Sequence, residues 1–229
     1  MAIPGRQPVL THNFKTMKSA TQPTSPSTSA HALDTLLAEV RACRLCERHL
    51  PLGPRPVLVA HTQARILVVG QAPGTKVHQS GITFDDASGE RLRDWMGLDR
   101  AAFYNPLLVA FLPMGFCYPG RGTSGDRPPR PECAVAWRAK LLAQLPRIEL
   151  MLLVGQYAQA WHLGLQRKST LTETVRAWRD YGPATLPLPH PSPRNNIWLK
   201  RNPWFELEVV PTLRERVQGL RPVTVAPRA

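Results

Sequence analysis

Residues 64–74 of this 229-residue chain read ARILVVGQAPG. The apolar, β-branched run at residues 64–69 is typical of a buried strand, and it stops at Gly70. A loop rich in turn residues follows, and then a helix begins near Ser88, with Ser88 or Asp86 as its cap. A strand that leads through a loop into a helix is the repeating unit of a parallel sheet covered by helices.

The rest of the chain repeats this alternation. Short apolar runs predict three more strands, at residues 107–112, 149–154 and 184–188. Apolar spacing predicts helices at residues 133–145, 157–163, 170–180 and 203–219. The expected fold is therefore a three-layer α/β/α domain with a central, mainly parallel four-stranded sheet. In open α/β sheets the loops beyond the carboxyl ends of the strands form the active site.

Composition divides the chain into three parts. Residues 1–30 are rich in Ser, Thr and Pro and have no apolar period, which predicts a disordered tail. Residues 31–219 form the α/β domain, whose first helix carries Leu33, Leu37 and Val40 at helical spacing. Residues 220–229 are expected to fray.

Charge and cysteine content narrow the function classes. Lys and Arg number 29 against 16 Asp and Glu, and the net charge of +13 favours phosphate-bearing partners such as DNA. No apolar run of about 18 residues is present, so no membrane partner is expected. Four cysteines and no secretory signal indicate a reducing, cytoplasmic compartment. No obligate protein partner is evident, and a monomer is expected.

The cysteines form two pairs. Two residues separate Cys43 from Cys46, and fifteen separate Cys117 from Cys133. This pattern fits a four-thiolate metal site, either tetrahedral zinc or an iron–sulfur cluster. Spacing does not separate these two, and four free thiols are the plain alternative.

An aromatic residue and two carboxylates follow the first loop. Phe84 beside Asp85 and Asp86 suits a pocket that stacks a flat ring and positions a water molecule. The structural alternative places Phe84 in the core and the aspartates at a helix N-cap.

The fourth strand ends in the sequence HPSPRNN, residues 190–196. His190 is placed to donate a hydrogen bond to an oxygen on which negative charge develops. Ser192, Arg194 and Asn195 are suited to grip a phosphodiester. Basic residues near these loops and the second cysteine pair predict a groove along a DNA backbone, and they include Arg121, Arg127, Arg130, Arg138 and Lys140.

Together these motifs resemble the uracil-DNA glycosylase superfamily. The resemblance rests on GQAPG, the segment from Gly81 to Phe84, the Ser88-Gly89 pair and HPS, and it covers residues 40–217. The cysteine spacing is most similar to the iron–sulfur branch, families 4 and 5. The resemblance implies hydrolysis of the N-glycosidic bond of uracil, or a related deaminated base, in DNA by base flipping.

The resemblance also implies roles for particular residues. Cys43, Cys46, Cys117 and Cys133 would hold a [4Fe–4S] cluster, with structural zinc as the alternative. The flipped base would lie between Phe84 and the loop Gly70-Gln71-Ala72. Asp86, with Asp85 second, would align the water, and His190 would support the departing base.

Three positions depart from the family pattern. Gln71 replaces a Glu or Leu, and Ala72 stands where the best-known branch has an aspartate. Residues 113–116 replace an asparagine that often follows the second strand. These departures keep a second hypothesis open, a member that binds DNA or a modified base without excision. A flavodoxin-like nucleotide-binding domain fits the strand order but not HPS or the cysteines.

Overall fold

The computed structural model describes residues 26–123 and 125–221. The predictions for residues 1–25 and 222–229 lie outside these ranges. Within the described residues, no helix has the length and apolarity needed to cross a membrane.

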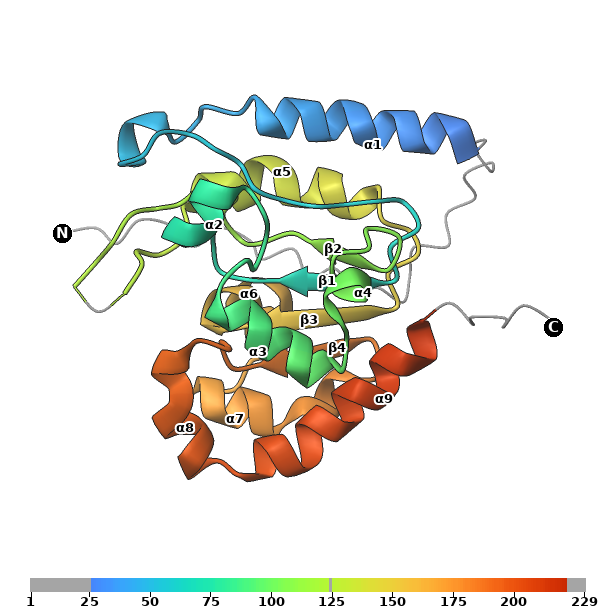
Figure 1. Ribbon diagram of the computed structural model, residues 1–229, viewed down its shortest axis with the longest axis vertical. Coiled ribbons are helices and arrows are strands. Elements are labelled where there is room, and N and C mark those ends of the chain that lie inside the picture. The colour runs from blue at the N-terminus through green and yellow to red at the C-terminus, as the bar shows by residue number, and fades with distance from the viewer. Residues whose placement is uncertain (1–25, 124, 222–229) are drawn as a thin grey trace.

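Four parallel strands form the central sheet (Figure 1). They are β1 (Ile66–Val69), β2 (Val109–Phe111), β3 (Leu150–Val154) and β4 (Thr185–Leu188). Their order is β2-β1-β3-β4, with Ile66 opposite both Val109 and Leu150. The predicted sheet is confirmed, and because every pair is parallel, all four carboxyl ends lie at one edge.

Helices cover both faces of the sheet, because the apolar side chains of β1 point alternately to opposite faces and each face must be buried. Ile66 and Val68 pack into one core and Leu67 and Val69 into the other. The first core is closed by α3 (Ala87–Met96), α4 (Arg100–Phe103), α7 (Leu171–Arg176), α8 (Asn196–Arg201) and α9 (Val210–Leu220). The second is closed by α1 (Pro26–Arg41), α5 (Pro131–Ala143) and α6 (Gln156–Leu163). Figure 1 shows α1 and α5 on one side of the sheet and α3 and α9 on the other.

Several boundaries differ from those expected. Helix α1 begins at Pro26, so the prediction of a disordered tail as far as residue 30 is wrong for its last five residues. The helix expected at 170–180 is divided into α7 and a 3₁₀ turn at Trp178–Tyr181. The last helix begins as a π-helical turn at Phe205–Val209 and continues as α9.

Candidate functional site

The loops after β1 and β2 are joined through their backbones. The Met114 N–H donates to the Gly70 carbonyl (2.9 Å) and the Gly115 N–H to the Gln71 carbonyl (3.0 Å). Within the described part of the chain, the N–H groups of Gln71 and Ala72 donate to no backbone carbonyl. The Gln71 side chain turns away to donate to the Arg127 carbonyl (3.2 Å). The loop therefore offers backbone donors rather than a side chain.

Phe84 lies over this loop in a strained conformation. Its φ is 54°, the left-handed region that non-glycine residues seldom adopt. The Tyr104 hydroxyl donates to the Phe84 carbonyl (3.1 Å) and helps to hold the turn. The ring is half-buried, edge-on to Phe103, and a Cβ at Gly70 would lie only 3.1 Å from it. Gly70 thus allows the close approach of ring and loop, and Phe84 joins the core while closing one side of the site.

The two aspartates lie in different surroundings. Asp85 pairs with Arg100 (3.2 Å), at the exposed start of α4. Asp86 is the N-cap of α3, where its Oδ1 accepts the Gly89 N–H (2.9 Å). Asp86 also lies within electrostatic reach of His190. Of the two, Asp86 faces the strand-end loops, and it caps the helix in place of Ser88, which lies inside α3.

His190 is held by its own loop. The Ser192 N–H donates to His190 Nδ1 (3.2 Å), and the Asn195 side chain donates to the His190 carbonyl (2.7 Å). Burial lowers the pKa of His190, while the charge of Asp86 acts in the opposite direction. A neutral imidazole that accepts at Nδ1 carries its proton on Nε2. His190 is therefore a neutral hydrogen-bond donor at the carboxyl end of β4.

Arg91 of α3 fastens the HPS loop to the segment that carries Asp86. Its guanidinium donates to the Ser192 carbonyl (3.0 Å) and to Asn196 Oδ1 (2.7 Å). Asp86 and His190 are thus connected through one helix and one side chain.

A further carboxylate comes from the long loop between β2 and α5. Asp126 Oδ2 lies 3.4 Å from the position of a Cβ at Gly74, next to the GQAPG loop. Burial and the nearby Asp86 raise the pKa of Asp126, while Arg194 and Arg121 lower it. Arg194 packs directly on Gly125, where a Cβ would lie 2.4 Å from its Nη1. Sequence patterning missed Asp126 because this loop has no periodicity.

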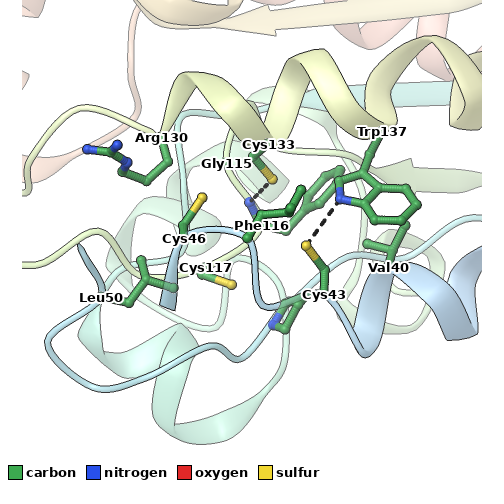
Figure 2. A pocket seen from close by; sticks show the side chains of 12 residues that line it. Val40, Cys43, Cys46, Leu50, Gly115, Phe116, Cys117, Arg130, Cys133 and Trp137 are labelled. Carbon is green, nitrogen blue, oxygen red and sulfur yellow. Dashed lines mark hydrogen bonds between the residues drawn. The ribbon is translucent and has the colours of Figure 1, made fainter. Parts of the chain in front are cut away.

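The four cysteines gather around one pocket, although they come from distant segments (Figure 2). Cys43 and Cys46 follow α1, Cys117 lies in the long loop, and Cys133 lies in the first turn of α5. Apolar side chains complete the lining, including Val40, Leu50, Phe116 and Trp137.

The surroundings suit sulfur ligands. The Trp137 indole N–H points at Cys43 Sγ (3.3 Å) and the Phe116 N–H at Cys133 Sγ (3.4 Å). Burial raises the pKa of Cys117 to about 11 and that of Cys133 to about 12, so metal-free thiols here are neutral at pH 7. A cation that stabilises thiolates would offset this cost, and thiolates are the ligands of structural zinc and of iron–sulfur clusters. As arranged among the described residues, no three His, Cys, Asp or Glu side chains form a metal-binding group.

The basic residues near the second cysteine pair are not all available to a DNA backbone. Arg130 pairs with Glu132, and Arg138 is 1% exposed inside the domain. The prediction that Arg138 lines a groove is therefore wrong. Arg121 and Arg127 are exposed beside the strand-end loops, as expected.

The sequence of this domain matches one family of known proteins. The family model described as the uracil DNA glycosylase superfamily matches residues 56–214. The match includes all four strands, the loops after β1, β2 and β4, and the second cysteine pair. It begins after Cys43 and Cys46. Because it spans more than half of the chain, this chain belongs to the uracil DNA glycosylase superfamily.

Proposed function

We propose that this chain is a DNA glycosylase that hydrolyses the N-glycosidic bond of uracil, or a related deaminated base, in DNA. The observation that carries the proposal is the position of His190. It is a neutral donor at a strand end, within electrostatic reach of Asp86. The same sheet edge presents the Gln71 and Ala72 N–H groups, which donate to no backbone group among the described residues. Superfamily membership supports DNA as the substrate.

In the proposed reaction the flipped base enters beside Phe84, and the Gln71 and Ala72 N–H groups bind its polar edge. The C1′–N bond breaks, its electron pair goes to the base, and His190 Nε2–H donates to the oxygen that gains charge. Asp86 Oδ1 is engaged by the Gly89 N–H, which leaves Oδ2 to orient the water. Oδ2 accepts the proton of the water as the water oxygen bonds to C1′. The same carboxylate stabilises the positive sugar.

We propose that Cys43, Cys46, Cys117 and Cys133 hold a [4Fe–4S] cluster, with structural zinc as the alternative. The bound group would serve as a cross-link between the segment after α1 and the loop before α5.

The test uses purified protein and uracil-containing single- and double-stranded oligonucleotides, followed by alkali to cleave abasic sites. Wild type should produce strand breaks, and His190→Ala should reduce the rate by about 10²- to 10³-fold through the lost donor. Asp85→Asn is the matched control, since Asp85 pairs with Arg100, and it should retain the wild-type rate.

An absence of strand breaks with the wild-type protein would reject the glycosylase. Ala72 is the observation that favours the second candidate, because the first loop carries no acidic side chain. Tight binding of uracil-containing DNA without strand breaks would support that candidate, a base-binding member without excision.

A further inference from the structure

The prolines of the HPS loop (residues 190–196) leave His190 a single backbone donor close by. Residues 191 and 193 are prolines, which carry no N–H, so Ser192 has the only backbone N–H between His190 and Arg194. A residue before a proline is restricted to extended or polyproline-like conformations, and Ser192 has φ −58° and ψ 143°. Its N–H donates to His190 Nδ1 (3.2 Å). The state of the His190 ring therefore depends on the orientation of one peptide group.

The carbonyl of Ser192 is held from two directions. The Asn195 N–H donates to it within the loop (2.9 Å), and Arg91 Nη1 donates to it from α3 (3.0 Å). The other terminal nitrogen of Arg91 donates to Asn196 Oδ1 (2.7 Å), where α8 begins. The donors of a guanidinium have a rigid, planar geometry, so two acceptors fix its orientation. Arg91 thus fixes the residue that donates to His190.

Arg91 has no carboxylate partner among the described residues. None of the ion pairs within residues 26–123 and 125–221 includes it, and both oxygen atoms that it contacts in the HPS loop are neutral. A hydrogen bond from a charged donor is about twice as strong as one between neutral groups. The positive charge of Arg91 therefore strengthens its contacts with the HPS loop.

The helix that carries Arg91 also carries the cap that holds Asp86. Asp86 is the N-cap of α3, and its Oδ1 accepts the N–H of Gly89, two residues before Arg91. Helix α3 therefore holds both groups of the proposed reaction, the carboxylate through its cap and the imidazole through Arg91 and Ser192.

A neutral imidazole has two tautomers, and one of them suits the proposed reaction. With the proton on Nε2, His190 Nδ1 accepts the Ser192 N–H and Nε2 donates. With the proton on Nδ1, the Ser192 N–H would face another donor, and Nε2 would only accept. Such a ring gives no hydrogen bond to an oxygen that gains negative charge. The contact with Ser192 therefore selects the tautomer that can act.

We propose that Arg91 is a positioning residue that holds the Ser192 peptide against His190 and so fixes both the Nε2–H tautomer and the position of the ring. The inference rests on the proposed function for the role of His190 in excision, whereas the tautomer is a property of the chain without substrate. Its consequence is that Arg91 contributes to excision through His190.

The first experiment is a double-mutant cycle on the full-length protein. The alkali assay measures the single-turnover rate of uracil excision for wild type, Arg91→Met, His190→Ala and the double variant. Arg91→Met should slow excision by about 10- to 100-fold, as for a misplaced catalytic group. In the His190→Ala background the same change should slow excision no further. Arg91→Lys, which keeps the charge and a donor, should recover part of the rate.

Arg214→Met is the matched control for the cycle. Arg214 of α9 donates to the Asp94 carbonyl of α3 (2.9 Å). Its replacement removes the same charge and the same kind of contact to a carbonyl, but away from the HPS loop. This variant should therefore retain the wild-type rate.

Nitrogen NMR of the His190 ring supplies a readout that does not depend on excision. The signals are identified by their loss in His190→Ala. Wild type should show a proton on Nε2 and none on Nδ1, and Arg91→Met should show a mixture of both tautomers.

A proton on Nδ1 in wild type would overturn the proposal, as would unchanged ring nitrogens in Arg91→Met or an equal slowing with and without His190. If Arg91→Met does not fold, Arg91→Lys takes its place in the cycle, where its smaller loss should also vanish in the His190→Ala background. A wild type that leaves no abasic sites would reject the glycosylase instead, and the ring nitrogens would still decide whether Arg91 fixes the tautomer.

Discussion

At the scale of single residues, the turn at Phe84 depends on a glycine in the following helix. A Cβ at Gly89 would lie 1.7 Å from the Phe84 carbonyl oxygen, a separation that forces the backbone to move. The same carbonyl accepts the Tyr104 hydroxyl, so a displaced turn loses that hydrogen bond as well. Gly89 therefore sets the position of the Phe84 ring over Gly70.

Gly89→Ala is expected to lower the free energy of unfolding by at least about 1–3 kcal/mol, the usual cost of forcing atoms into a packed space. Chemical denaturation measures this. Gly219→Ala is the matched control, because Gly219 is also helical but a Cβ there meets nothing within 4 Å. That change should stabilise the protein by about 0.5–1 kcal/mol, and a similar loss in both variants would contradict the explanation.

His162 gives the stability a pH dependence. Burial and then the charge of Arg138 lower its pKa to about 3 in the folded chain, against an ordinary value of about 6.5 when unfolded. Between these values the unfolded chain binds the extra proton, so stability should fall as the pH drops below about 6.5, by up to about 1.4 kcal/mol per pH unit. His162→Gln should flatten the slope of the melting temperature between about pH 4 and pH 6.5.

The exposed His31 on α1 supplies the control for that experiment. His31→Gln should leave the slope of the wild type unchanged. A His162→Gln protein with the wild-type slope would show that another group is responsible.

Some site residues were predictable from sequence and others were not. His190 and the GQAPG loop follow apolar runs directly, so strand ends located them. Asp126 and Arg138 depend on tertiary packing, because one lies in an aperiodic loop and the other resembles any exposed helical arginine. A charged residue becomes a buried clamp only when the sheet brings the Leu112 carbonyl to it.

At the scale of elements, the start of α3 combines a structural and a proposed chemical role. Asp86 caps α3, and Asp99 caps α4 in the same way, with its Oδ1 accepting the Ala102 N–H (2.7 Å). Serine is about as good an N-cap as aspartate, but it has no carboxylate. Replacing Asp86 with serine therefore keeps the helix cap and removes the carboxylate of the proposed mechanism.

Asp86→Ser should keep its melting temperature close to that of wild type, yet reduce uracil excision by about 10²- to 10⁴-fold, as for a lost general base. Thermal unfolding and the alkali assay on the same preparation measure both. Asp99→Ser should preserve stability and activity alike. Normal excision by Asp86→Ser would remove Asp86 from the proposed mechanism.

The strands and the longer helices were predictable from apolar patterns, and three of the shortest helices were not. The four strands and the helices α1, α3, α5, α6 and α9 follow apolar patterns. Helices α2 (Thr75–Ser80), α4 and α8 have four to six residues, too few to show a period, and were missed. Tertiary contacts fix them, as with Leu199 of α8 in the first core.

At the scale of the whole molecule, the net charge is +13, and arginines lie at both ends of the sheet. Arg127 lies at the carboxyl end, where its carbonyl accepts the Gln71 side chain. Arg147 lies just before β3, at the amino end. DNA bound at the strand-end loops should therefore interact with Arg127 and not with Arg147.

Arg127→Gln is expected to weaken DNA binding and to reduce the magnitude of the slope of log affinity against log salt by about 0.9 for duplex DNA, the value for one lost phosphate contact. Fluorescence anisotropy across a salt series measures the slope. Arg147→Gln keeps the same net charge as Arg127→Gln and should retain the wild-type slope. Equal effects in both variants would indicate charge acting without a defined binding face.

The strand order has a consequence for how the chain is made. Ile66 of the central strand pairs with Val109 and Leu150, and Met151 in turn pairs with Thr185. During synthesis, the first strand therefore emerges long before either neighbour, with backbone groups open to mispairing. Such distant pairings favour slow folding. His190 follows the last strand, so a nascent chain cannot assemble the site until nearly all of the domain has left the ribosome.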